Sequence, residues 1–309
     1  MKFVKPLFSI LKNIRQPLPD FGTGLVESPV DTRDYLLSSC AYLPTEIPDE
    51  LPPLFRGLID IHYQGTNPSC VGHASAHIKS EKELRERNRI AFDGEHLYAE
   101  CKKIDGLPNL RGTFFRTALK VLQKQGAMPQ GGGDPARFKI GSYALVDDAS
   151  FEGLKKAICV NGYLLSGYRG SNAGWKTAYV RPPKSGEAIW GHAIALVGYT
   201  KDYLIGVNSW GSLWGANGYF YIPRNYVPIE AWAILADLPT PPEVGVVGWV
   251  AEMYLKDNKV VPEVGLNLRR GVGTNQAIIK LLPKGTAVEP FMSERVFANG
   301  LWWIKVRVI

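Results

Sequence analysis

The pattern of apolar and polar positions changes character along the 309 residues of the chain. Small and apolar residues from Cys70 to Ile78 give way to a charge-rich run from Lys79 to Arg87. This pattern predicts a helix beginning at Cys70, with a buried first half and a solvent-facing second half whose opposite charges pair. A second amphipathic helix is expected from Thr113 to Gln125, ending at Gly126.

The chain beyond residue 190 has the pattern of strands rather than helices. Runs rich in Val, Ile and Tyr predict strands over residues 193–199, 203–207 and 218–222. Helices followed by antiparallel strands indicate the α+β fold class. We therefore expect an α+β domain over residues 59–238, preceded by an N-terminal extension over residues 1–58.

The C-terminal part is expected to form a separate domain. A proline-rich linker over residues 239–245 favours an extended, semi-rigid spacer. The several short β-like runs after it predict a small all-β barrel over residues 246–309.

Composition and charge narrow the classes of protein. Apolar residues make up 45% and charged residues 21%, as in an ordinary globular protein. No apolar run approaches the roughly 18–20 residues needed to span a bilayer, so no transmembrane segment is predicted. The net charge of +7 resides at the two ends of the chain. It indicates either docking to an acidic partner or a solvated basic surface, and we predict no nucleic-acid partner.

The cysteines and the N-terminus suggest a cellular setting. The four cysteines have no paired spacing suited to zinc or to a disulfide framework, which favours synthesis in a reducing compartment. No small-residue cleavage site follows the first twenty residues. We therefore expect cytoplasmic synthesis without a clear signal peptide, with association to a cell envelope or a virion as further alternatives.

Cys70 is the first candidate for chemistry. It stands where a turn over residues 65–69 ends and the predicted helix begins, with Ser69 as a candidate cap. Unpaired amides and the helix dipole at such a position stabilise a thiolate. A lone cysteine at a helix start is more often structural than catalytic, so the surrounding pattern must decide.

Three further segments stand at compatible spacings. Gln64 precedes Cys70 by six residues, and His192 opens an apolar strand within Gly-His-Ala-Ile. Asn208 follows His192 by sixteen residues, within Asn-Ser-Trp-Gly, which contains Trp210. Together these segments resemble the papain-like cysteine peptidases, over residues 60–236.

The resemblance implies a role for each of these residues. Cys70 forms the acyl-enzyme, His192 acts as its general base, and Asn208 orients the imidazole ring. The Gln64 side chain and the Cys70 backbone amide hold the oxyanion. The resemblance also implies that three residues line the substrate site: Gly112, Thr113 and Trp210. The substrate is a polypeptide, and neither a cofactor nor a metal is expected.

The chain also departs from the family pattern. Asn67 and Val71 stand where cysteine and tryptophan are usual, and Thr113 stands where a second glycine is expected. The residues before Gln64 are too few for the long inhibitory propeptide of secreted relatives. Two interpretations stay open: the enzyme is made without this safeguard, or its N-terminal segment covers the cleft.

Two other histidines allow a metal-site hypothesis. His73 and His77 are four residues apart on the first predicted helix, a spacing that also occurs in metal sites. No third ligand accompanies them in the sequence. We interpret both as packing or surface residues.

The C-terminal runs over residues 266–274, 278–286 and 300–306 resemble bacterial SH3-like domains. This resemblance implies a barrel that attaches the enzyme to cell-wall peptides or to another protein. Phe291, Trp302 and Trp303 are candidates for an aromatic binding groove, although at least one is expected in the core. The combination points to a bacterium or a bacterial virus.

Three functions follow from these observations. The first is an endopeptidase that cuts polypeptides and is tethered by its SH3-like domain. The second is a peptidase of the peptide cross-links in bacterial cell wall. The third is a structural or docking component, such as part of a phage particle, that uses the peptidase fold as a scaffold.

Overall fold

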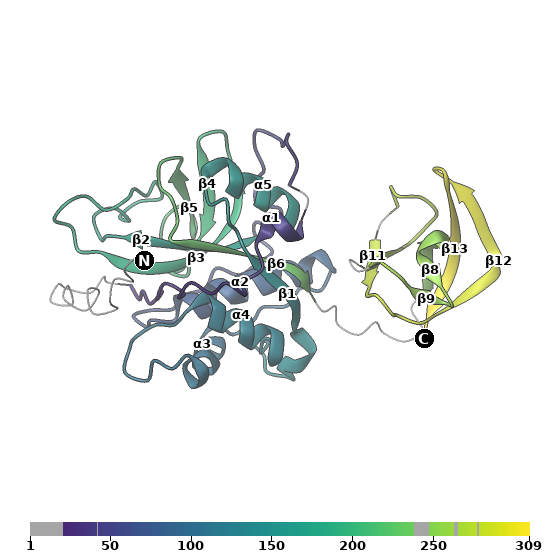
Figure 1. Cartoon of the computed structure of the whole chain (residues 1–309), viewed down its shortest axis with the longest axis horizontal. Coiled ribbons are helices and arrows are strands. Elements are labelled where there is room, and N and C mark those ends of the chain that lie inside the picture. The colour runs from purple at the N-terminus through teal and green to yellow at the C-terminus, as the bar shows by residue number, and fades with distance from the viewer. Residues whose placement is uncertain (1–20, 42, 238–246, 263–264, 277) are drawn as a thin grey trace.

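The computed structural model describes residues 21–41, 43–237, 247–262, 265–276 and 278–309. The main body contains one antiparallel sheet of six strands, in the order β1-β6-β2-β3-β4-β5 (Figure 1). Its strands are β1 (Ile140–Leu145), β2 (Leu164–Gly170), β3 (Trp190–Tyr199), β4 (Tyr203–Val207), β5 (Tyr219–Pro223) and β6 (Glu230–Asp237). The three predicted strands thus correspond to β3, β4 and β5.

Helices precede and flank this sheet. They are α1 (Leu37–Cys40), α2 (Cys70–Arg85), α3 (Gly94–Ile104), α4 (Phe115–Lys124) and α5 (Phe151–Asn161), with a short 3-10 helix, η3 (Pro135–Phe138). Both predicted helices are confirmed as α2 and α4, and Gly126 follows α4 with a φ of 94° that suits glycine.

Two hydrophobic cores hold the main body together. The first lies where α2, α3 and α4 pack against the sheet, and it includes Val71, Leu119 and Val197. The second joins α5 to the sheet, and it includes Leu154 and Tyr199. Cys70 belongs to the first core, so the packing that stabilises the fold also positions the start of α2.

The second half of α2 corrects the sequence prediction. Lys79 and Glu83 were expected in solvent, yet both are fully buried and form an ion pair at 2.7 Å. Glu81 is also buried and pairs with Arg85 one turn later. The charges are buried because each has a partner one helical turn away, and leaving one of them unpaired there would be strongly destabilising.

His73 and His77 lie inside the protein, as the packing interpretation predicted. The Nδ1 atom of His73 is 3.0 Å from Nδ1 of His62, and the rings of His62 and His77 are 4.1 Å apart. His77 Nε2 is 3.1 Å from the carbonyl oxygen of Asp60, so this nitrogen donates. The described residues contain no cluster of His, Cys, Asp and Glu arranged to hold a metal ion.

This buried histidine cluster predicts acid sensitivity. Burial lowers the pKa of His77 to about 3, assisted by the nearby His73. An unfolded chain binds the proton near pH 6.5, so stability is present above that pH and is lost as the pH falls. We expect His77→Gln, which keeps a donor for Asp60, to make the loss between pH 6.5 and 4 shallower by about 1.4 kcal/mol per pH unit.

Urea unfolding at several pH values measures this slope. The part-exposed His96 supplies the control, His96→Gln, which should leave the slope as in the parent chain. Equal slopes in the parent chain and His77→Gln would contradict the assignment of acid sensitivity to the cluster.

The C-terminal unit has its own sheet and its own core. Its five strands are antiparallel in the order β11-β10-β7-β13-β12, and its core includes Leu268, Ile304 and Val306. The elements are β7 (Val247–Ala251), η4 (Glu252–Tyr254), β8 (Leu255–Lys256), β9 (Lys259–Val260), β10 (Leu266–Arg269), β11 (Ile278–Leu282), β12 (Val288–Ala298) and β13 (Leu301–Val308). The five-stranded sheet is open in this strand order, and the predicted linker lies outside the described residues.

The three aromatic residues singled out in this unit differ in burial. Trp303 is 2% exposed and belongs to the interior, whereas Trp302 is 47% exposed and lies 5.4 Å from the ring of Phe297. Phe291 lies under the cationic groups of Lys305 and Arg307. The prediction that at least one of these aromatics is a core residue is confirmed for Trp303.

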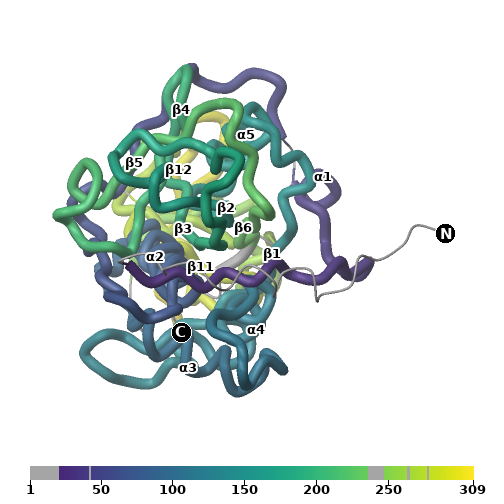
Figure 2. Tube along the Cα trace, turned by 90° about the vertical axis from the view of Figure 1, so that its left-hand side faces the viewer, coloured from purple at the N-terminus to yellow at the C-terminus, as the bar shows by residue number. Residues whose placement is uncertain are grey.

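Residues 21–34, here called the strap, cross the main body as an extended segment. Figure 2 shows this purple segment passing between the strands of the sheet and the helices α3 and α4. It forms one isolated bridge rather than a regular strand, the parallel bridge between Leu25 and Thr113. Within the part of the chain that the structure describes, no helix is long and apolar enough to cross a membrane.

Candidate active site

Cys70 is the first residue of α2 and is fully buried. Ser69 precedes the helix, but its hydroxyl donates to Glu95 at 2.6 Å instead of capping the helix amides. The backbone groups of Ala193, Val71 and Gly24 lie close enough to the thiol to lower its pKa, against the larger effect of burial. The thiol therefore lies between the start of α2, the strand that carries His192, and the strap.

His192 and Asn208 form a direct pair. Nε2 of His192 is 2.8 Å from Oδ1 of Asn208, which also accepts the backbone amide of Ser209 at 2.8 Å. An amide oxygen only accepts, so the imidazole carries its proton on Nε2 and presents a bare lone pair on Nδ1. Among the described residues, Nδ1 has no hydrogen-bond partner and is buried. This is the tautomer that a general base requires.

Three tryptophan rings surround the imidazole. The centroid of Trp210 lies 4.6 Å from that of His192, and Trp175 meets the histidine edge-on at 5.7 Å. Trp190 lies 6.0 Å away. These rings exclude water from the pair of His192 and Asn208, which strengthens their hydrogen bond. Trp175 was not predicted, because it stands in a loop that carries no motif.

Gln64 is held by contacts at both ends of its side chain. Ser209 donates its hydroxyl to Oε1 of Gln64 at 2.5 Å, and Nε2 of Gln64 donates to the carbonyl oxygen of Asn67 at 2.7 Å. The backbone amide of Gln64 donates to Ser209 at 2.9 Å. An amide nitrogen has two hydrogens, so one remains to bind a developing oxyanion.

The strap occupies the cleft through its backbone. Gly22 donates its amide to Gly65 at 2.7 Å, and Leu25 donates to the carbonyl of Gly191 at 3.1 Å. Thr113 donates to the carbonyl of Gly24 at 2.9 Å. The predicted substrate residue Thr113 thus binds a peptide backbone that belongs to the same chain.

Glycines make this close approach sterically feasible. A Cβ atom at Gly22 would overlap the carbonyl group of Asn67, and one at Gly24 would overlap that of Pro68. On the opposite side, a Cβ at Gly112 would meet the backbone of Gly24, and Gly112 has a φ of 92°. Gly112 therefore has both a conformational and a packing reason to be glycine.

Side chains of the strap fill two further positions. Leu25 is 8% exposed, and its side chain lies where a Cβ at Gly167 would stand, beside Phe115. Phe21 stacks on Trp210 with a centroid distance of 5.1 Å, and the indole nitrogen of Trp210 donates to Gly22 at 3.0 Å. The strap thus engages both sides of the position of Cys70.

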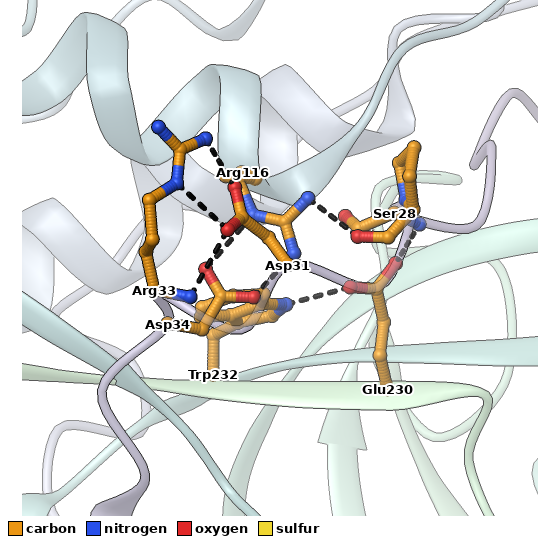
Figure 3. Close-up of polar contacts among 8 residues, drawn as sticks. Ser28, Asp31, Arg33, Asp34, Arg116, Glu230 and Trp232 are labelled. Carbon is orange, nitrogen blue, oxygen red and sulfur yellow. Dashed lines mark hydrogen bonds and ion pairs between the residues drawn. The ribbon is translucent and has the colours of Figure 1, made fainter.

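Polar contacts anchor the C-terminal half of the strap (Figure 3). Arg116 donates through Nε and Nη2 to the two carboxylate oxygens of Asp34, with the Nε contact at 3.0 Å. It also donates to the carbonyl of Pro29 at 2.7 Å. Glu230 accepts the amide of Ser28 at 2.9 Å and the indole of Trp232 at 2.7 Å. We call the Arg116–Asp34 and Glu230–Ser28 contacts the latch.

The covered site is electrically neutral. Burial raises the pKa of Cys70 to about 12, and burial lowers the pKa of His192 to about 4 despite the hydrogen bond to Asn208. Both shifts favour the thiol and the uncharged imidazole over an ion pair of thiolate and imidazolium. A thiol buried in this way carries little thiolate, which is the form in which cysteine acts as a nucleophile.

Comparison with known proteins shows which peptidases the main body resembles. Residues 129–235 match the sequence profile described as papain family cysteine protease. This part of the chain is therefore similar in sequence to the papain family. The chain is also 31% identical over 202 residues to a peptidase C1-like protein of Acanthamoeba polyphaga mimivirus, across 54% of this chain. The match spans 65% of the length of that viral relative.

Solved structures show the same papain-like α+β fold. Xylellain, a cysteine protease from Xylella fastidiosa, superposes with a TM-score of 0.62 at 21% identity, over 72% of this chain and 98% of xylellain. Procathepsin B from Trypanosoma congolense gives a TM-score of 0.53 at 17% identity, over 63% and 79% of the two chains.

The papain-family motifs predicted from the sequence converge on one region of the domain. His192 and Asn208 are in direct contact, Gln64 is tied to Ser209, and Trp210 covers the imidazole. The catalytic roles of these residues stay predictions. The sequence reasoning missed Leu25 and Gly24, whose only signal was the pair of glycines spaced two residues apart in the N-terminal extension.

The contact of Asn208 with His192 predicts a partial loss of activity in Asn208→Ala. Without the amide oxygen, the imidazole loses the acceptor that fixes its tautomer, so we expect kcat to fall by about 10- to 100-fold while KM changes little. Steady-state hydrolysis of a peptide substrate measures both constants. An increase in KM with kcat unchanged would instead assign Asn208 to substrate binding.

Proposed function

We propose that this chain is a cysteine peptidase that hydrolyses peptide bonds and is held latent by its own strap. The observation that carries the proposal is the extended peptide lying in the cleft between Thr113 and Gly191, next to a thiol and an Asn-paired histidine. A cleft that hydrogen-bonds one polypeptide backbone in this way supports a polypeptide substrate.

The proposed reaction follows from the arrangement of the site. Once the strap is displaced, Nδ1 of His192 takes the thiol proton of Cys70, and the sulfur attacks the substrate carbonyl carbon. The oxyanion receives hydrogen bonds from Gln64 and from the backbone amide of Cys70. The carbon–nitrogen bond breaks as the imidazolium protonates the leaving nitrogen, which gives a thioester and a free amine.

Water completes the cycle in the second half-reaction. His192 accepts a proton from water as its oxygen attacks the thioester carbon, and the carbon–sulfur bond then breaks. The proton returns to the sulfur, and the carboxylic acid product leaves. Asn208 keeps the imidazole in one orientation through both half-reactions.

An epoxide inhibitor selective for activated cysteines tests the proposal. We expect mass spectrometry of the labelled full-length chain to place the adduct on Cys70, with slow labelling because the strap covers the thiol. The strap variant Leu25→Asp should label faster. Absence of any Cys70 adduct in this variant, with a native circular dichroism spectrum, would favour the scaffold interpretation over an enzyme.

The C-terminal unit is proposed as an SH3-like targeting domain. Exposed Trp302 and Phe297 form an aromatic pair at the surface, and Arg295 lies over the Trp302 ring at 4.5 Å. This pair supports a role for the unit in binding cell-wall peptides or a protein partner. Trp303 is excluded from such a groove by its burial.

The second candidate, a cell-wall cross-link peptidase of a bacterium or phage, rests on this targeting domain. Sedimentation with purified cell wall compares the parent chain with Trp302→Ala. We expect less of the variant in the pellet, while hydrolysis of denatured casein is unchanged. Equal sedimentation of both chains would argue against targeting through Trp302. Release of peptides from cell wall but not from casein would favour the second candidate.

A further inference from the structure

In addition to the buried contacts of Leu25, the strap forms an ion pair with an arginine of the sheet. Arg169, near the end of β2, pairs with Glu27 at 2.6 Å. Glu27 follows Leu25 by two residues, and in an extended segment alternate side chains point to the same side. The carboxylate and the buried leucine are therefore presented to the domain together, at neighbouring positions along the cleft.

This pair lies at an open depression of the surface. The depression has a volume of about 450 Å³, and Arg169 and Glu27 line it together with Tyr226. Its remaining walls come from two proline-containing loops, residues 182–183 and 227–229. This space is present with Glu27 in place, so Arg169 borders room for a further side chain.

The local charges leave Arg169 available to a carboxylate. Arg181, the nearest neighbour in the adjoining loop, is paired with Glu187 at 2.5 Å. Glu230 is occupied by Ser28 and Trp232. Among the described residues, Glu27 is the carboxylate that pairs with Arg169. When the strap leaves, the guanidinium group therefore faces an open depression without its counter-charge.

We propose that Arg169 forms a subsite for an acidic side chain of the substrate, and that Glu27 imitates this side chain in the latent form. The acidic residue would stand two positions from the apolar residue that fills the position of Leu25, as Glu27 does in the strap. The inference rests on the proposed peptidase function and specifies its substrate as a polypeptide with an acidic residue at that position.

The size of the effect follows from exposure. The side chains of Arg169 and Glu27 are 60% and 50% exposed, so the pair lies largely in water. An exposed ion pair contributes up to about 1 kcal/mol, which corresponds to about a five-fold preference. The preference should decrease with added salt, because ions screen exposed charges.

Matched peptides test the subsite in the full-length chain with Leu25→Asp, which loosens the strap without altering the cleft. The substrates are two matched pairs of aminocoumarin amides: acetyl-Glu-Ala-Leu-Gly against acetyl-Gln-Ala-Leu-Gly, and acetyl-Leu-Ala-Glu-Gly against acetyl-Leu-Ala-Gln-Gly. The two pairs cover both directions of the substrate chain, and the members of each pair differ only in charge. We expect kcat/KM to favour the glutamate peptide by about two- to five-fold in one pair. A ratio of one in both pairs would overturn the subsite. Adding Arg169→Ala should bring the ratio to one, and Arg169→Glu should invert it.

The control is Lys184→Ala, which removes an exposed lysine from the adjoining loop and should leave the ratio unchanged. A ratio that Arg169→Ala does not alter would overturn the subsite and restrict Arg169 to holding the strap. Failure of the Leu25→Asp chain to hydrolyse any peptide would instead overturn the proposed function itself. The two failures are thus distinguishable.

Discussion

The full-length chain with Cys70→Ala is expected to lose hydrolysis of denatured casein altogether. Attack on the carbonyl requires the sulfur, and neither His192 nor the oxyanion donors can replace it. Removal of the nucleophile from a hydrolytic triad lowers kcat by about 10⁴-fold or more, which places the residual rate near background. Hydrolysis of fluorescently labelled casein measures this loss. The Cys70→Ala change is tested both in the parent chain and in a chain that also carries Leu25→Asp.

The fold should survive the same change. Replacing a thiol by a hydrogen at a fully buried position removes one small group, at a cost of about 1 kcal/mol. Cys101 offers a matched control, because it is also fully buried and burial also raises its pKa. Cys101→Ala should retain activity. Loss of activity in both variants, or unfolding of Cys70→Ala, would assign Cys70 to the core instead of the chemistry.

The chain with Leu25→Asp is expected to react with the epoxide about 100-fold faster than the parent chain. Leu25 loses the burial that contributes about 2 kcal/mol, and a carboxylate in the same pocket would be desolvated beside Phe115. Each 1.4 kcal/mol changes the population of the displaced strap about ten-fold. The second-order rate of Cys70 modification, measured by mass spectrometry over time, reports that population.

The pH dependence of labelling supplies a second measurement on this variant. Burial under the strap raises the pKa of Cys70 to about 12, so the parent chain should react slowly until strongly alkaline pH. Displacement of the strap admits water and lowers that pKa toward its usual value or below, as expected at a helix start. The midpoint of the labelling profile should therefore move to lower pH in Leu25→Asp.

Val30 provides the control within the strap, because its side chain is 98% exposed. Val30→Asp introduces the same charge into the same segment without disturbing a buried contact. It should label at the parent rate. Equal acceleration by both variants would mean that charge in the strap, rather than the Leu25 pocket, controls access to Cys70.

Local patterns predicted those parts of the fold that bury a continuous apolar stripe. The segments over residues 193–199 and 203–207 are nearly continuous apolar runs, as in strands buried on both faces. The helix α4 repeats apolar residues at helical spacing. The second half of α2 failed this reasoning, because the burial of Lys79 depends on Glu83 and on the surrounding packing. A charge pattern alone does not distinguish a solvated face from a buried, internally paired one.

The sequence predicted a segment covering the cleft only as one of two interpretations of the N-terminal extension. The contacts of the strap are made largely by backbone amides and carbonyls of Gly22, Gly24 and Leu25, which every residue type except proline possesses. Such contacts leave no periodic pattern. Similarly, adjacent Trp302 and Trp303 look equivalent in sequence, but the alternation of a strand places one at the surface and the other inside.

The contact between Arg116 and Asp34, part of the latch, keeps the strap close to the cleft at any protein concentration. Strap and cleft belong to one chain, so the occupant is present at an effective local concentration in the millimolar range, whatever the bulk concentration of protein. Dilution therefore leaves inhibition unchanged. A cut in the chain between Asp34 and Asp60 would convert reclosing from a unimolecular step into a bimolecular one, and the freed strap would then be lost by dilution.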